Sequence, residues 1–133
     1  MIADFVLDTS ALIAYVRGEP GAPFIASILS AHYCIMHAVN VGEFCYTAVR
    51  CLPDRFVSPE SAILWLNQAG VGRSHDLTSS FLILSARVRR ASPALSFGDG
   101  VAVALASALC IPLLTTEKAF DKAAEFAEIR RIR

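Results

Sequence analysis

The feature that most constrains the fold is the junction between residues 2–7 and residues 9–16. Residues 2–7 are largely apolar, and the run ends abruptly at Asp8. The hydroxyl residues Thr9 and Ser10 follow, and apolar residues then recur with helical spacing. This pattern is typical of a buried parallel strand that leads directly into a helix. Because ligands of open α/β sheets bind at the carboxyl ends of the strands, Asp8 lies where a functional site is expected.

The rest of the chain alternates between short apolar segments and amphipathic segments. Further strands are expected over residues 33–36, 71–75, 111–115 and 128–133, and further helices over residues 21–31, 39–52, 58–68, 77–90, 96–109 and 118–127. This alternation predicts an α/β fold, a three-layer α/β/α sandwich around a mainly parallel sheet. Residues 71–75 are polar enough to form an edge strand. Phe24 and Leu77 are expected to face the core. The length, with no repeat or linker, predicts one domain over residues 1–133.

The composition limits the classes of partner. The chain has 12 basic and 12 acidic residues, so its formal net charge is zero. A neutral chain is unsuited to coating nucleic acid without regard to sequence, because such binding needs a basic excess. Hydrophobic residues make up 55% of the chain, which predicts an exposed apolar face in addition to a core. We therefore expect self-association or a protein partner.

The apolar segments do not predict a membrane protein. The longest, residues 101–114, is interrupted by Ser107 and Pro112 and is shorter than the roughly 20 residues that a membrane span needs. Asp4 and Asp8 interrupt the amino-terminal apolar run, so we expect no signal peptide.

The cysteines and histidines do not have the spacing of a metal site. The four cysteines lie in apolar segments without a Cys-x-x-Cys pair, which predicts buried thiols in a reducing cytoplasm. They are Cys34, Cys45, Cys51 and Cys110. The three histidines show no ligand spacing with one another or with the cysteines.

Four acidic residues occur close to predicted strand ends or helix starts. Asp8 closes the first strand, and Glu43 lies in the expected first turn of the helix after the second strand. Asp99 lies in the first turn of the alanine-rich helix over residues 96–109, and Glu117 follows the fourth strand. In a parallel sheet, Asp8, Glu43 and Glu117 point toward the same rim. Asp99 joins them if its helix also starts at that rim.

Each acid also has a simpler interpretation. The pairs Asn40 with Glu43 and Ser96 with Asp99 have the spacing of a capping box, and any one of the acids could serve only as a helix cap. Together, however, four carboxylates at one rim would repel one another unless a cation held them. Oxygen ligands of this kind suit Mg²⁺ or Mn²⁺ better than Zn²⁺. Such an ion on carboxylates is well suited to hydrolysing phosphodiesters.

These segments, taken in order, resemble the PIN-domain family, and specifically the VapC-like toxins of bacterial toxin–antitoxin pairs. The resemblance covers essentially the whole chain. It rests on the segments 7–12 (LDTSAL), 38–43 (AVNVGE), 95–100 (LSFGDG) and 113–120 (LLTTEKAF), together with the turn at 18–21 (GEPG). The first segment alone is weakly specific, whereas the ordered set is strongly specific.

The resemblance implies an Mg²⁺- or Mn²⁺-dependent endoribonuclease, the toxin of a type II pair. It implies a homodimer that a small antitoxin protein inhibits. The catalytic and metal-binding residues that it implies are Asp8, Glu43, Asp99 and Glu117, and the supporting hydroxyls are those of Thr9, Ser10 and Thr116. We expect Asp8 and Asp99 to hold the principal ion, and Glu43 and Glu117 to hold a second ion or orient the attacking water.

The sequence departs from the family pattern in two places. Glu117 stands where the family more often has Asp, and Asp121, four residues later, could substitute for it. Gly98 and Gly100 flank Asp99, where the family tends to have residues with side chains, and this predicts a looser helix start.

The arginines are candidate phosphate contacts, although solvent-exposed positions are expected for most of them. They are Arg17, Arg50, the arginines of residues 87–90, Arg130, Arg131 and Arg133. With no net charge, RNA binding should rest on few such contacts and should depend only modestly on salt.

Other functions remain open from the sequence. A phosphatase with Asp8 as nucleophile would need an acid two residues later, where Ser10 stands. A receiver domain would need an acid at the end of a central strand, and Asp76 follows only a weak one. A PIN-like binding module without catalysis and an RNA-processing nuclease without an antitoxin are the more serious alternatives.

Overall fold

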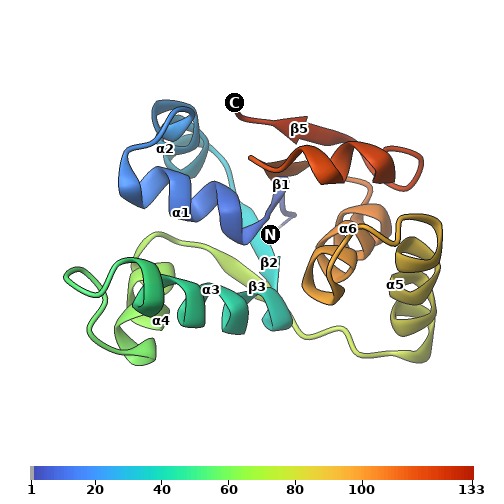
Figure 1. Cartoon of the computed structure of the whole chain (residues 1–133), viewed down its shortest axis with the longest axis horizontal. Coiled ribbons are helices and arrows are strands. Elements are labelled where there is room, and N and C mark those ends of the chain that lie inside the picture. The colour runs from blue at the N-terminus through green and yellow to red at the C-terminus, as the bar shows by residue number, and fades with distance from the viewer. Residues whose placement is uncertain (1) are drawn as a thin grey trace.

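The computed structural model describes residues 2–133, and within them five strands form one sheet (Figure 1). The strands are β1 (Phe5–Leu7), β2 (Cys34–His37), β3 (Gly72–Ser74), β4 (Leu113–Thr115) and β5 (Ile129–Arg131). Their order is β3-β2-β1-β4-β5, and every neighbouring pair is parallel. The expected parallel sheet and the edge position of residues 71–75 are confirmed.

The helices begin and end largely where local signals predict. They are α1 (Thr9–Arg17), α2 (Ala22–Ala31), α3 (Ala38–Cys51), α4 (Pro59–Gln68), α5 (Ser79–Ala91), α6 (Phe97–Leu109) and the 3₁₀ helix η1 (Lys118–Ala123). Gly18 ends α1 with a positive φ of 67°, which a residue without Cβ adopts at little cost. Ser58 caps α4 through a capping box. The prediction of a helix over residues 118–127 is wrong in length and type, because the chain forms a 3₁₀ helix there that ends at Ala123.

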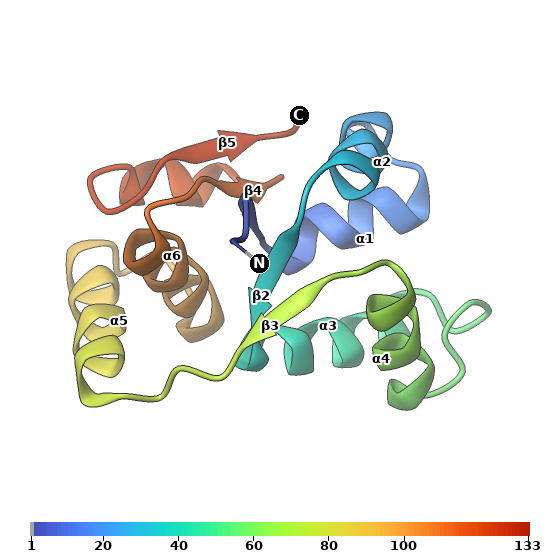
Figure 2. The same cartoon turned by 180° about the vertical axis from the view of Figure 1, so that it is seen from behind.

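Helices cover both faces of the sheet, as the two opposite views show (Figures 1 and 2). Side chains along β1 alternate between the two faces, so Phe5 and Leu7 pack with α1–α4 whereas Val6 packs with α5, α6 and η1. Leu7 and Val6 are both fully buried. Burying an aliphatic side chain of this size stabilises a fold by about 1.5–3 kcal/mol. The predicted three-layer α/β/α sandwich is therefore confirmed.

Three side chains lie elsewhere than the sequence pattern predicts. Leu77 is 64% exposed because α5 begins only at Ser79, so Leu77 precedes the helix. Phe24 is 43% exposed because the buried face of α2 is narrow. Cys110 is exposed at the end of α6, although buried thiols are expected for all four cysteines. No helix within residues 2–133 is long and apolar enough to cross a membrane.

The sheet order places a topological switch point beside β1. From β1 the chain adds β2 and β3 on one side, and then returns to add β4 and β5 on the other. Ligands of open α/β sheets bind at the carboxyl edge of such a switch point. The backbone N–H of Asp8 donates to the carbonyl of Leu114 over 3.0 Å, so the ends of β1 and β4 meet there.

Candidate active site

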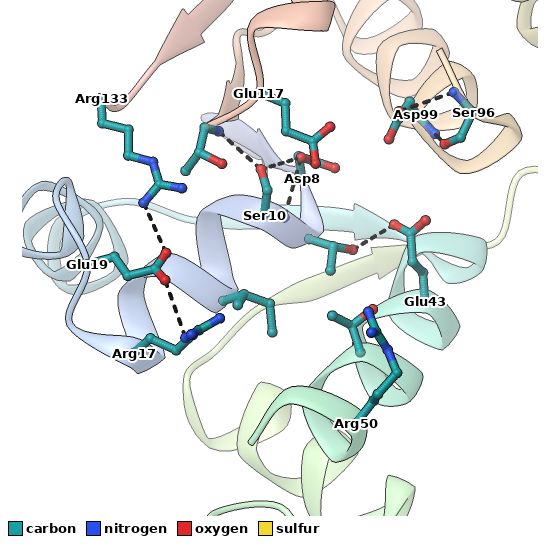
Figure 3. Close-up of a pocket in the computed structure, with 14 residues that line it drawn as sticks. Asp8, Ser10, Arg17, Glu19, Glu43, Arg50, Ser96, Asp99, Glu117 and Arg133 are labelled. Carbon is teal, nitrogen blue, oxygen red and sulfur yellow. Dashed lines mark hydrogen bonds and ion pairs between the residues drawn. The ribbon is translucent and has the colours of Figure 1, made fainter. Parts of the chain in front are cut away.

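A pocket of about 630 Å³ opens at the carboxyl edge of the sheet (Figure 3). Residues from five separate parts of the chain line it. Among them are the four acids Asp8, Glu43, Asp99 and Glu117 and the hydroxyl residues Thr9, Ser10 and Thr116. Asp121 does not line this pocket, and its carboxylate lies 3.4 Å from Nε of Arg131. The fold thus brings together the acids that the sequence predicts and leaves the proposed substitute outside.

Asp8 is held rigidly at the junction of β1 and α1. It is the N-cap of α1 and only 2% exposed. Its Oδ2 accepts hydrogen bonds from Oγ of Ser10 over 2.6 Å, from the Ser10 N–H over 3.4 Å and from Oγ1 of Thr115 over 3.0 Å. Its Oδ1 accepts no hydrogen bond from residues 2–133. One oxygen therefore fixes the side chain and the other is left for a ligand.

Ser10 and Thr115 connect the ends of β1 and β4. The Oγ of Ser10 accepts from the backbone N–H of Thr116 over 3.1 Å and lies 3.2 Å from Oγ1 of Thr115. Thr115 Oγ1 also accepts from the N–H of Glu117 over 3.0 Å. Sequence reasoning named Thr116 but missed Thr115. The signal was available, because Thr115 is a polar residue at the last buried position of an apolar strand.

Glu43 lies in the second turn of α3, not in its first. His37 caps α3 by accepting the Val39 N–H at its Nδ1, so the alternative interpretation of Asn40 and Glu43 as a capping box is wrong. The carboxylate of Glu43 is instead free to accept a hydrogen bond of 2.8 Å from Oγ1 of Thr9. This bond turns Glu43 toward the first residue of α1.

Asp99 combines a structural role with a place in the pocket. It forms the predicted capping box, because its carboxylate accepts the Ser96 N–H over 3.2 Å and its own N–H donates to Oγ of Ser96 over 3.1 Å. Nδ2 of the fully buried Asn40 donates to the Gly98 carbonyl over 2.9 Å, which joins the starts of α3 and α6. Helix α6 therefore begins at the carboxyl edge of the sheet, as Asp99 requires in order to join the other three acids. Sequence reasoning had not identified this role of Asn40.

The electrostatics of the pocket are unfavourable for a cluster of unpaired carboxylates. Burial, and to a lesser extent the negative charges of Asp99 and Glu117, raise the pKa of Asp8 to about 7, although the Ser10 hydrogen bond opposes the shift. Partial burial, followed by the charges of Asp99 and Glu43, also raises the pKa of Glu117. None of these four acids forms an ion pair with a basic side chain of residues 2–133. A bound cation would relieve this repulsion.

The donor set fits a hard divalent ion in its chemistry. Carboxylate and hydroxyl oxygens are the ligands that Mg²⁺ and Mn²⁺ prefer. Among residues 2–133, no three His, Cys, Asp or Glu side chains are already gathered closely enough to hold one ion. The hydrogen bond from Thr9 holds the carboxylate of Glu43 toward α1, and the bond from Ser96 holds the carboxylate of Asp99 at the start of its own helix α6. Binding an ion would therefore require rotation of these side chains.

The two glycines beside Asp99 make room for other side chains. A Cβ at Gly98 would lie 2.7 Å from Oε2 of Glu43, and a Cβ at Gly100 would lie 2.7 Å from Cγ of Arg89. Both glycines are helical and neither has a positive φ. The structure adds a steric role to the expected looser helix start, because the absence of a side chain at Gly98 lets Glu43 approach α6.

For the ribonuclease activity that the resemblance implies, replacing Gly98 with Ala should lower the rate of RNA cleavage about 10-fold without loss of folding. The new methyl group would displace the flexible end of Glu43, whereas alanine would favour the helix by up to about 1 kcal/mol. The measurement is the cleavage rate together with the melting temperature. Gly100→Ala is the matched control, because it disturbs Arg89, which does not line the pocket. Equal rates for the two variants would contradict a role for the position of Glu43.

Comparison with known proteins identifies the family. The PIN domain family model matches residues 5–126. None of the curated proteins matches the sequence. Among solved structures, a toxin–antitoxin complex from Klebsiella pneumoniae is similar with a TM-score of 0.74 and 15% identity, over 98% of each chain. DNA-bound VapBC from Salmonella typhimurium has a TM-score of 0.71 and 13% identity over 100% of each chain. VapBC2 from Rickettsia felis, bound to a promoter DNA fragment, has a TM-score of 0.70 and 12% identity over 98% of each chain. The chain belongs to the PIN domain family.

Proposed function

We propose that the chain is an Mg²⁺- or Mn²⁺-dependent endoribonuclease and the toxin of a type II toxin–antitoxin pair. The observation that carries this proposal is the pocket lined by four carboxylates from β1, α3, α6 and the segment after β4, none of which has a basic partner within residues 2–133. Membership of the PIN domain family supports it.

The proposed roles follow from how each carboxylate is held. Asp8 is the most rigid, and its free Oδ1 would bind the principal ion together with Asp99. Glu43, oriented by Thr9, and Glu117 would bind a second ion or orient the attacking water. When bound, the ion would lower the pKa of water and stabilise charge on the phosphoryl oxygens. The products would carry a 5′-phosphate and a 3′-hydroxyl.

The proposed protein partners are a small antitoxin and a second copy of the chain. The similar structures from Klebsiella, Salmonella and Rickettsia are toxin–antitoxin or VapBC assemblies, which supports the antitoxin. Exposed apolar side chains on α3 and α4, including Tyr46 and Leu64, support self-association. Sedimentation at increasing protein concentration would test the dimer, and a monomer throughout would contradict it.

The free thiols support a reducing compartment, which we propose is the cytoplasm.

The test is digestion of an end-labelled RNA oligonucleotide by purified protein, first in EDTA and then with added Mg²⁺ or Mn²⁺. We expect cleavage only with the added ion, with 5′-phosphate products. RNA that is bound but left intact in every condition would favour the binding module without catalysis. An antitoxin would be encoded by a gene next to this one. If coexpression of that neighbouring gene does not inhibit cleavage, an RNA-processing nuclease without an antitoxin is favoured.

A further inference from the structure

The pocket that holds the four acids also has a basic side. Three arginines from distant parts of the chain line it, namely Arg17, Arg50 and Arg133. The other arginines considered from the sequence, those of residues 87–90 together with Arg130 and Arg131, do not line it. The fold thus places three arginines of a larger, mostly exposed set beside the carboxylates.

Two of these arginines share one carboxylate. Glu19 lies between them, with its Oε2 3.3 Å from Nε of Arg17 and its Oε1 3.0 Å from Nη1 of Arg133. Figure 3 shows this group on the opposite side of the pocket from Asp99. One carboxylate between two guanidinium groups leaves a positive excess and holds both side chains in fixed positions.

Arg50 is the third arginine and lies on the same helix as Glu43. It is on α3, seven residues after Glu43, and its guanidinium carbon lies 5.7 Å from the centre of the Tyr46 ring. Within residues 2–133 its guanidinium group makes no ion pair. Arg50 can therefore bind an anion without first giving up a carboxylate partner.

We infer that the basic side is a phosphate subsite, which binds an RNA phosphate next to the scissile one. This inference rests on the proposed nuclease function and specifies its substrate. Guanidinium groups bind phosphate oxygens through paired hydrogen bonds, whereas the acidic side repels phosphate in the absence of an ion. The substrate must therefore span both sides and carry at least two phosphates.

At such a subsite, Glu19 would limit the affinity for RNA. It occupies the same guanidinium groups that a phosphate would contact, so it competes with RNA for Arg17 and Arg133. If Glu19 only supported the fold, replacing it would weaken RNA binding. If Glu19 competes with RNA, removing its charge would strengthen RNA binding, so the direction of the change in Kd separates the two roles.

The experiment measures RNA affinity without cleavage. An Asp8→Asn protein in EDTA is titrated into a fluorescent RNA oligonucleotide at several salt concentrations. Arg50→Gln should raise Kd about 10-fold and reduce the slope of log Kd against log salt by about 0.7, the value for one lost contact to single-stranded nucleic acid. Glu19→Gln should lower Kd several-fold, and melting curves check that each variant is folded.

Arg87→Gln is the matched control, because it removes one positive charge from an exposed residue of α5 outside the pocket. It should change Kd less than 2-fold.

A second series replaces single phosphates of the RNA with neutral methylphosphonates. One replacement should weaken binding to the reference protein about 10-fold and have no further effect on the Arg50→Gln variant.

Two results would overturn the subsite. They are equal Kd values for the Arg50→Gln and Arg87→Gln variants, and weaker binding by the Glu19→Gln variant. If either is found while the unmodified protein still cleaves RNA, the nuclease proposal stands and the subsite does not. If the binding results hold and no ion supports cleavage, the nuclease proposal fails, and the basic side is an RNA phosphate site with no scissile phosphate beside it.

Discussion

Replacing Asp8 with Asn is expected to lower metal-dependent RNA cleavage by about 1000-fold or more while the protein stays folded. An asparagine oxygen can accept the same hydrogen bonds from Ser10 and Thr115, so the junction of β1 and α1 is kept. The charge that would hold the ion is lost. Metal stabilisation of a transition state contributes several kcal/mol, and each 1.36 kcal/mol is a factor of 10 in rate.

The measurement is the single-turnover cleavage rate at saturating Mg²⁺ or Mn²⁺. Asp121→Asn is the control, since it also removes one carboxylate near the carboxyl edge but from a residue that pairs with Arg131 outside the pocket. Its rate should lie within 2-fold of the unmodified protein. Cleavage by the Asp8→Asn variant at the unmodified rate would mean that the activity belongs to another site or a contaminant.

In the metal-free protein, the free energy of unfolding is expected to fall as pH rises. Asp8 should cause most of this fall. Its pKa is raised in the folded state from 3.8 to about 7. The folded state therefore favours the protonated acid, so the related stability is fully present below pH 3.8 and is lost progressively up to pH 7. The loss amounts to roughly 4 kcal/mol, from 1.36 kcal/mol per pKa unit. The raised pKa of Glu117 acts in the same direction.

Urea unfolding in EDTA at pH 4.5 and pH 8 measures this change. The unmodified protein should lose a few kcal/mol more than the Asp8→Asn variant between the two pH values, because asparagine does not ionise. Addition of Mn²⁺ at pH 8 should restore the stability of the unmodified protein and leave the variant unchanged. Parallel pH profiles for the two proteins in EDTA would show that Asp8 is not buried as an unpaired acid.

Much of the fold could be predicted from local patterns. The apolar run before Asp8, the Ser58 cap and the break at Gly18 each act within a few residues, so the sequence carries the whole signal. The polarity of residues 71–75 correctly predicted an edge strand. The placing of Asp8, Glu43 and Glu117 at one edge followed from the parallel sheet, because strands that run the same way end on the same side, whereas the place of Asp99 depended on where α6 begins.

The parts that the sequence could not predict depend on contacts between distant segments. Thr115 reaches Asp8 across 107 positions, and Asn40 reaches Gly98 across 58. The room that Gly98 leaves for Glu43 requires two helices to be placed first. Local propensity also favoured a longer last helix than the 3₁₀ turn that the chain forms before β5.

The most direct test of the central claim, that distant carboxylates jointly bind a divalent ion, is anomalous X-ray scattering from a crystal of the protein soaked in Mn²⁺. We predict an anomalous peak in the pocket about 2.0–2.2 Å from carboxylate oxygens of both Asp8 and Asp99, a distance typical of oxygen ligands to small divalent ions. The peak should be absent from crystals of the Asp8→Asn variant. A soaked crystal with no peak in the pocket, or with Mn²⁺ bound only elsewhere, would contradict the claim.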